Sequence, residues 1–220
     1  KAVGNDFPVA IKLNSDDFRK GGFNNEECLR VVEWLNDSHI DLLEISGGTY
    51  EQPRLLGSEG KSDSIVPVRA STKVREAYFL EYASAIHKVA HMPLMVTGGF
   101  RTAEGMEAAL NSGDCDIIGL ARPLCTHPNV PQQLLTRMMK VTPQYEKELV
   151  IGKQRLLSPA SPIELIKIMN VQGAQGWYYE QMYRLADNQT PEFELSVSKA
   201  YYRYWKNELL SAWKLHKARQ

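Results

Sequence analysis

The stretch from Pro93 to Pro123 constrains the fold of this chain more than any other. It contains two short apolar runs, 94–97 and 116–120, and between them a segment, 102–111, whose apolar residues recur at helical spacing. Gly98-Gly99 follows the first run, and Ala121-Arg122-Pro123 follows the second. A strand, a helical crossover and a second strand in this order predict a βαβ unit with parallel strands.

The same alternation precedes and follows this unit. Apolar runs at 7–13 and 40–46 are each followed by a segment of helical periodicity, at 25–37 and 75–90, and a further helix is expected at 131–140. Four strand–helix repeats predict an α/β fold with a parallel sheet and right-handed crossovers. A complete (β/α)8 barrel needs about 250 residues, so residues 1–140 can form only part of one.

Both turns of the βαβ unit have the composition of an anion site. Gly98 and Gly99 allow the backbone to approach a ligand closely, and Arg122 offers a guanidinium fork to phosphate oxygens. Arg101 is a weaker candidate, because it could equally be solvated at the start of the helix. For Arg122 the ordinary alternative is a surface arginine, whereas for Gly119 a packing role is the better interpretation.

Lys12 is the one charge inside the apolar run 7–13. A lysine in a buried strand is costly unless it has a partner, and its ordinary role would be to extend its ammonium group to the rim of the sheet. The long segment 49–74 has little periodicity and is expected to overhang the carboxyl ends of the strands as a functional lid.

Composition excludes several classes. Lys plus Arg and Asp plus Glu both number 26, so a general nucleic-acid binder is not expected. The three cysteines form no C-x-x-C pair, the histidines show no metal-ligand spacing, and no apolar run reaches 18 residues. We therefore expect a cytoplasmic protein with reduced thiols, no metal site and no membrane span.

Six short motifs resemble one family. GGFRT after one strand, GLARPL after the next and then HPNVP are similar to the end of the barrel in the old yellow enzyme family, the FMN-dependent NAD(P)H:flavin oxidoreductases. IKLNSDDF, EISGG and REAYF fit the same family in the same order. The resemblance covers roughly residues 3–140 and implies the C-terminal half of a TIM barrel, with 141–220 as a helical extension.

The resemblance also implies a site. In the family the turn after the seventh strand and the arginine after the eighth hold the FMN phosphate, which assigns Gly98, Gly99, Phe100, Ala121 and Arg122 as cofactor-binding. A basic residue at the position of Lys12 lies under the flavin ring, where it stabilises reduced flavin. NAD(P)H would be the reductant, and the substrate a small molecule with an electron-poor C=C bond, such as an enone.

The family's catalytic His-His or His-Asn pair and its proton-donating Tyr come from the first half of the barrel, so no catalytic residue is assigned here. We expect the chain to be inactive alone and to need the missing N-terminal half, in the same polypeptide or as a partner chain. Whether the chain forms a homo-oligomer, and with how many subunits, stays open. Two alternatives remain: a non-catalytic half-barrel that serves as a binding or scaffold subunit, and a phosphate-binding barrel enzyme without flavin.

Beyond residue 140 the sequence predicts helices at 162–170 and 173–186, the first capped by Ser161, and a last helix at 195–217. The last helix has an aromatic stripe and many basic residues, which suits either protein docking or a membrane surface. Docking is favoured, because Glu192, Glu194 and Glu208 dilute the basic charge that anionic lipid requires.

Overall fold

The computed structural model describes residues 4, 6–17, 21–46 and 80–218. The segment expected to form a lid, 49–74, lies outside these residues. Residues 47–48 and residues 75–79, the start of the helix expected at 75–90, lie outside them as well. The described chain divides into two compact units, the first formed by 1–121 and 134–142 and the second by 122–133 and 143–220.

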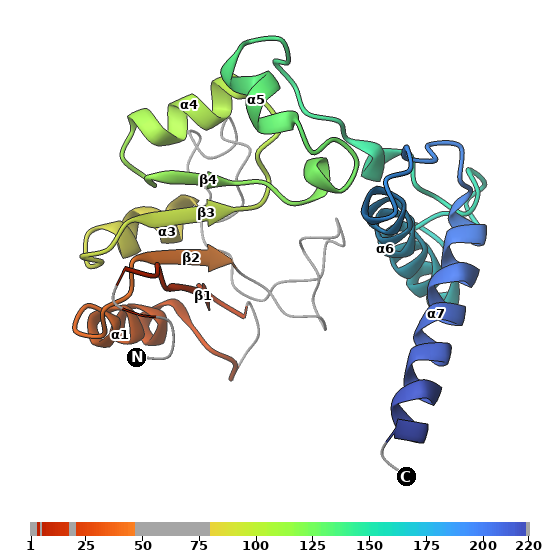
Figure 1. Cartoon of the computed structure of the whole chain (residues 1–220), viewed down its shortest axis with the longest axis horizontal. Coiled ribbons are helices and arrows are strands. Elements are labelled where there is room, and N and C mark those ends of the chain that lie inside the picture. The colour runs from red at the N-terminus through yellow and green to blue at the C-terminus, as the bar shows by residue number, and fades with distance from the viewer. Residues whose placement is uncertain (1–3, 5, 18–20, 47–79, 219–220) are drawn as a thin grey trace. The chain divides into compact units, whose positions relative to one another are not determined.

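The first unit is a parallel four-stranded sheet in the order β1-β2-β3-β4 (Figure 1). Its strands are β1 (Ala10–Asn14), β2 (Leu42–Ser46), β3 (Leu94–Thr97) and β4 (Ile117–Gly119). Its helices are α1 (Asn25–Leu35), α3 (Leu80–His87) and α4 (Ala103–Asn111). This α/β arrangement of successive parallel strands joined by helices confirms the predicted fold class.

One face of this sheet forms the core. Leu43 and Ile45 of β2 and Leu94 and Val96 of β3 are fully buried, because alternate residues of a strand point to the same face. The helices contribute buried apolar residues to this unit, among them Cys28, Val32, Leu80, Ala83, Ile86, Met106 and Ala109. The alternation of buried and partly exposed residues along β2 and β3 therefore separates a packed face from a more open one.

Two aspartates hold the amino ends of the strands in register. Asp41 accepts a hydrogen bond from the Val9 amide (2.7 Å) and donates its own amide to the Val9 carbonyl (2.9 Å). Asp116 makes the same pair of bonds with Leu94 (2.8 and 2.9 Å), and its carboxylate also lies 3.2 Å from the His87 ring. Asp41 precedes β2 and bonds the start of β1, and Asp116 precedes β4 and bonds the start of β3. These bonds connect the amino ends of neighbouring strands.

Local signals fix the helix starts in the first unit. Asn24 and Glu27 form the expected capping box on α1, with the Glu27 amide 3.0 Å from the Asn24 Oδ1 atom and the Asn24 amide 2.9 Å from Glu27. The helix expected at 131–140 is shorter: α5 (Val130–Leu135) stops before Arg137, whose φ of 62° is left-handed and incompatible with a continuing helix.

The second unit is built on α6 (Glu164–Ala186) and α7 (Val197–Ala218), with the short 3-10 helices η2 (Arg122–Cys125) and η3 (Tyr145–Lys147). The two helices predicted at 162–170 and 173–186 are a single helix, so this prediction was wrong. Gly173 does not interrupt α6, because it faces α7: a Cβ there would lie 2.6 Å from Val197 Cγ1. Only a glycine permits this close approach between the helices.

The predicted cap of this helix was also wrong. Ser161 does not cap α6, which begins at Glu164 after Ile163. The Ser161 hydroxyl instead donates to the Leu156 carbonyl (2.8 Å) and accepts from the Ile163 amide (3.1 Å), so it stabilises the turn before the helix. Long-range packing of the segment 151–157 on Asn170, whose side chain bonds Ile151 and Leu157, sets where the helix can start.

Candidate functional site

The turn after β3 and the residues after β4 lie at one edge of the sheet. β3 pairs with β4 in parallel, with Thr97 opposite Gly119, so the carboxyl ends of both strands meet there. Gly98 and Gly99 follow β3 with φ values of 123° and 79°. Residues with a side chain rarely adopt a positive φ, and two such residues in succession are rarer still. The shape of this turn therefore requires glycine at both positions.

The end of β4 is packed tightly against this turn. Gly119 is buried, and a Cβ on it would lie 1.8 Å from the hydroxyl oxygen of Thr97. Gly119 thus has the packing role that the sequence favoured. The Thr97 hydroxyl itself is buried and makes no hydrogen bond in the described part of the chain. A buried polar atom of this kind, directly before Gly98, is consistent with a polar ligand at the turn.

The start of α4 is already satisfied by protein groups. The Thr102 hydroxyl caps the helix by accepting from the Gly105 amide (3.0 Å), and the Ala103 amide donates to the Lys140 carbonyl (2.9 Å). The Arg101 guanidinium donates to the Phe100 carbonyl (3.0 Å). An anion at this edge would therefore meet the glycine turn before α4, and not the helix terminus itself.

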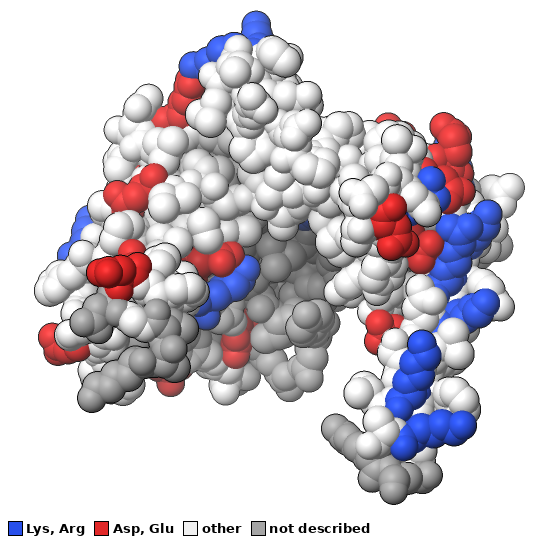
Figure 2. Space-filling view, viewed as in Figure 1, with Lys and Arg blue, Asp and Glu red and all other residues white. Residues whose placement is uncertain are grey.

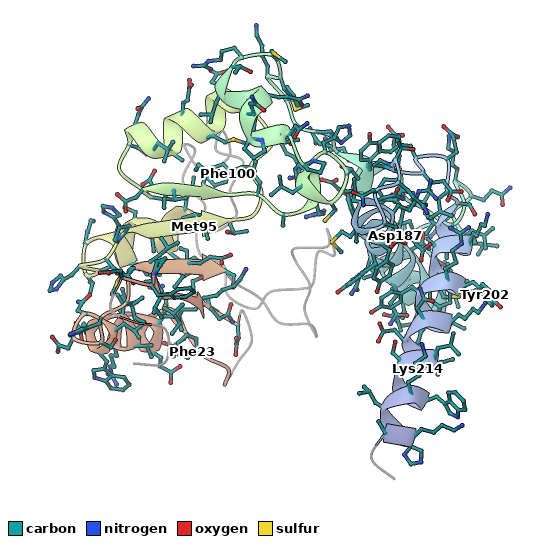
Figure 3. All side chains as sticks on the ribbon, viewed as in Figure 1. Phe23, Met95, Phe100, Asp187, Tyr202 and Lys214 are labelled. Carbon is teal, nitrogen blue, oxygen red and sulfur yellow. The ribbon has the colours of Figure 1, made fainter. Side chains whose placement is uncertain are left out.

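Phe100 contributes to this edge through its backbone. Its side chain is only 1% exposed and belongs to the core of the first unit, where Figure 3 labels it near the end of β3. The large apolar ring anchors the turn, because removing it from the core would expose most of an aromatic side chain. Its amide remains the part of Phe100 that can serve a ligand. Ala121, by contrast, is exposed two residues after β4.

Arg122 is the first residue of η2 and opens the second unit, directly after Ala121. Its Nη1 atom lies 3.7 Å from Oε1 of Glu146, and the other carboxylate oxygen of Glu146 accepts from the Tyr178 hydroxyl at 2.9 Å. The Arg122 side chain is 23% exposed. Glu146 is thus a neighbour of Arg122, the residue predicted to bind phosphate. The sequence did not reveal this pairing, since Glu146 lies 24 positions further along the chain.

Lys12 lies within β1 and has a partner. Its Nζ atom donates to Oε1 of Glu44 at 2.6 Å, and the two residues are opposite each other in the β1–β2 register. The row continues with Met95 on β3 and Ile117 on β4, two residues before Thr97 and Gly119, where these strands end. The expectation that Lys12 lies in a buried strand was wrong, because its side chain is 54% exposed and no residue of β1 is fully buried.

The described residues offer little for nucleophilic or metal chemistry. No cluster of three His, Cys, Asp or Glu side chains that could hold a metal ion occurs in the parts of the chain that the structure describes. Burial raises the pKa of Cys125, three residues after Arg122, and the arginine offsets this only in part. A thiol with a raised pKa stays protonated near neutrality and is a poor nucleophile.

Comparison with known proteins places these features in context. No family model matches the chain. The NADH-dependent flavin oxidoreductase iccE of Talaromyces variabilis is 35% identical over 177 residues, which are 76% of this chain and 40% of that protein. The NADH-dependent flavin oxidoreductase iliE of Neonectria sp. (strain DH2) is 36% identical over 127 residues, 57% of this chain and 16% of that protein.

This chain is a homologue of NADH-dependent flavin oxidoreductases. The relationship that the motifs indicated is therefore confirmed. The chain spans less than half the length of both relatives. Because the match to iccE takes in 76% of the chain, it must include part of the helical extension as well as part of residues 1–140.

A solved structure of a 2-naphthoyl-CoA reductase in complex with 2-naphthoyl-CoA has a similar fold, with a TM-score of 0.50 and 25% identity over 61% of this chain and 19% of that chain. The structural neighbours of this chain are TIM-barrel oxidoreductases that cover about 60% of it, which agrees with the four parallel strands of the first unit. The described part of the chain contains no helix long and apolar enough to cross a bilayer.

Proposed function

We propose that this chain forms the phosphate-binding side of an FMN site in an NADH-dependent oxidoreductase of the old yellow enzyme kind. One observation carries the proposal: Gly98 and Gly99, both with positive φ, follow β3 at the sheet edge where β4 also ends. Loops after neighbouring parallel strands in a barrel are a frequent place for a phosphate group. The similarity to flavin oxidoreductases supports a flavin nucleotide as the molecule that carries this phosphate group.

The residues present fit such a group. The amides of Gly98, Gly99 and Phe100 would face the phosphate oxygens, and Ala121 leaves room beside them. Arg122 would add a charge-assisted contact, which is stronger than a neutral hydrogen bond. Lys12 would hold a positive charge near the ring system, moderated by Glu44 at 2.6 Å. The flavin, when bound, supplies hydride transfer from NADH to an electron-poor C=C bond.

We further propose that turnover requires a second half-barrel, from the same polypeptide or from a partner chain. The open face of the sheet supports this, since Lys12 and Ile117 are exposed and Glu44 and Met95 are partly exposed. In a closed barrel this face would be the packed interior. This chain would then supply cofactor contacts, while the residues that protonate the substrate would come from the other half.

The test is a titration of the purified chain with FMN, followed by flavin fluorescence, alone and mixed with the N-terminal half of iccE. We expect FMN to bind and NADH-dependent reduction of an enone to occur only in the mixture. FMN binding without turnover in the mixture would favour a scaffold subunit. No flavin binding under either condition, with retained binding of inorganic phosphate, would favour a barrel enzyme of another kind and would refute the proposal.

A further inference from the structure

Within the described residues, the first half of α7 packs against protein and the second half is exposed. α7 crosses α6 where Gly173 and Gly176 allow a close approach, with Val197 and Ala200 buried there. Further along the helix, the Trp205 indole N–H donates to Gln172 Oε1 at 3.2 Å. Every residue from 206 to 218 is exposed, and α7 continues past α6 (Figure 1). The docking predicted from the sequence is therefore confirmed for the first half of the helix alone.

The uncovered half of α7 is amphipathic. Trp205, Leu209 and Trp213 are spaced by four residues and so share one face, and Leu209 and Trp213 are 67% and 55% exposed. Lys206 and Lys217 fall on the flank of this face at 100° per residue. The Lys217 Nζ atom lies 4.2 Å from the centroid of the Trp213 ring, so its aliphatic stem follows the apolar face while its charge stays at the boundary.

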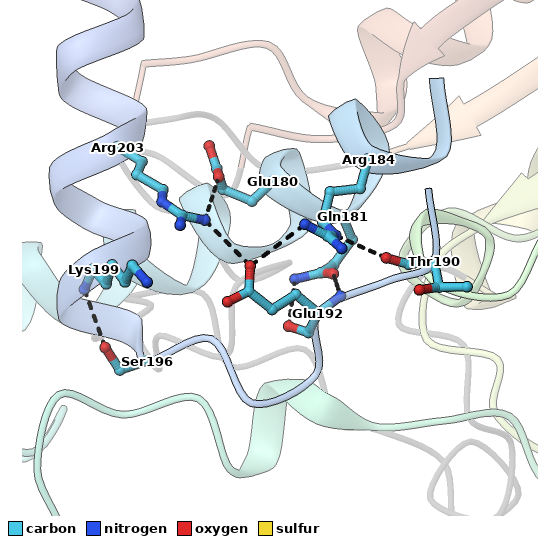
Figure 4. Close-up of polar contacts among 8 residues, drawn as sticks. All are labelled: Glu180, Gln181, Arg184, Thr190, Glu192, Ser196, Lys199 and Arg203. Atoms are coloured by element: carbon cyan, nitrogen blue, oxygen red, sulfur yellow. Dashed lines mark hydrogen bonds and ion pairs between the residues drawn. The ribbon is translucent and has the colours of Figure 1, made fainter. Parts of the chain in front are cut away.

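The charges of this helix are strongly unbalanced. α7 contains five basic residues and one acidic residue, Glu208, and basic side chains are spaced along its length (Figure 2). Glu192, which the sequence argument counted against a basic face, lies before α7 and is paired with Arg184 (3.7 Å) and Arg203 (3.4 Å), as Figure 4 shows. Arg203 also pairs with Glu180 at 3.1 Å.

The acidic residues Glu180 and Glu192 therefore lie beside the first half of α7. The exposed half contains three lysines, Lys206, Lys214 and Lys217, and one acidic residue, Glu208. A second copy of the chain is a poor occupant for this face. Antiparallel pairing would set the lysine flank of one copy against the same flank of the other, and parallel pairing offers the lysines a single acidic partner.

We propose that the exposed half of α7, residues 205–218, lies on anionic phospholipid surfaces. Tryptophan and leucine on one face with lysines at its boundary are the features of a helix that rests in the interfacial layer of a bilayer. Indole rings suit that layer, because they combine a large apolar area with one N–H donor. Each lysine near an anionic surface adds attraction that salt weakens. The chain would then be held at the membrane surface by the second half of α7, while the sheet of the first unit stays in water.

The experiment is flotation of the full chain with phosphatidylcholine vesicles that contain or lack phosphatidylserine. We expect flotation with the anionic vesicles only, decreasing as salt is added. Leu209→Glu should weaken it by about tenfold or more, because it puts a charge on the apolar face. Ser211→Glu is the matched control: it makes the same charge change on the opposite face and should weaken binding by less than about threefold.

A second readout follows tryptophan emission with vesicles that carry brominated lipids. Quenching is expected in the wild type and should be reduced in Trp213→Phe, which keeps the helix intact and leaves Trp205 as the remaining tryptophan of this face. Circular dichroism of each variant verifies folding, since all three positions are exposed. No flotation of the wild type, or equal flotation of Leu209→Glu and Ser211→Glu, would overturn the proposal. Lipid-free self-association that Leu209→Glu abolishes would also overturn it and would assign the face to a second copy.

Discussion

Lys12 donates to Glu44 across the β1–β2 register at 2.6 Å, so the cation proposed to lie beside the flavin is shared with a carboxylate. The lysine side chain is 54% exposed and that of Glu44 is 20% exposed. A fixed negative charge this close reduces the field that Lys12 can apply to a bound ring. Glu44 would then set the strength of the lysine's effect, a role that no sequence motif indicated.

Lys12→Met should lower the reduction potential of bound FMN, because the reduced anionic flavin loses a neighbouring positive charge. The expected change is on the order of 20–40 mV, equivalent to ~1–2 kcal/mol for a two-electron couple. Glu44→Gln should shift the potential in the opposite direction. Spectroelectrochemistry of the FMN-loaded protein measures both. An unchanged potential in both variants, with FMN still bound, would exclude Lys12 as the flavin's neighbour.

Arg122→Ala should weaken FMN binding by about 1.5–3 kcal/mol, the usual contribution of a charge-assisted hydrogen bond. Arg155→Ala is the matched control, because Arg155 is an exposed arginine of the same unit and lies outside the proposed site. Isothermal titration with FMN compares the two. Equal affinities for the variants would show that Arg122 is an ordinary surface arginine.

Glu146→Gln should tighten FMN binding by up to about 1 kcal/mol. The carboxylate lies 3.7 Å from Arg122, so in the wild type it partly neutralises the charge that would meet the phosphate. Glutamine keeps an oxygen that can accept from the Tyr178 hydroxyl. The same titration measures the effect. Weaker binding would mean that Glu146 mainly holds Arg122 in place and does not compete for it.

Gly173→Ala should destabilise the crossing of α6 and α7. Its methyl group would lie 2.6 Å from Val197 Cγ1, and overpacking of this kind costs about 1–3 kcal/mol, which exceeds the roughly 1 kcal/mol that alanine gains over glycine in a helix. Urea unfolding followed by tryptophan emission gives the change. Adding Val197→Ala should recover part of the loss. A Gly173→Ala variant as stable as wild type would contradict the close approach.

Stability should fall in alkali because of two buried thiols. Burial raises the pKa of Cys28 and of Cys115 from 9.0 to about 11. Below about pH 9 both folded and unfolded thiols are protonated, whereas between about pH 9 and 11 only the unfolded thiols ionise, which favours unfolding. Each thiol should cost about 1–3 kcal/mol across this window.

Urea unfolding at about pH 8 and pH 10.5 tests this, with Cys28→Ala and Cys115→Ala as variants. The alanine variants should be less stable at the lower pH, because each leaves a small cavity, but their stability should fall less between the two values. An identical fall in the wild type and in both variants would assign the alkaline loss to other groups.

The local signals in the sequence determined the parallel sheet. β3 has the bounds that its apolar run predicted, and β4 differs from its run by one residue at each end. The capping box of Asn24 and Glu27 placed the start of α1 because both partners lie within one turn of helix. Short motifs also predicted the glycine turn, where Gly98 and Gly99 have positive φ, whereas the cofactor role of Ala121 and Arg122 stays a prediction.

Tertiary structure alone decided the partners of these residues. Glu44 lies 32 positions from Lys12, and Glu146 lies in the extension, so neither pairing has a local signature. Gly173 would end a helix by its propensity, yet α6 continues through it because α7 packs against the bare backbone. Val197 and Ala200 of α7 are buried against α6, whereas residues 206–218 are exposed: helix periodicity marks an apolar face, but only the position of a neighbour determines whether protein covers it.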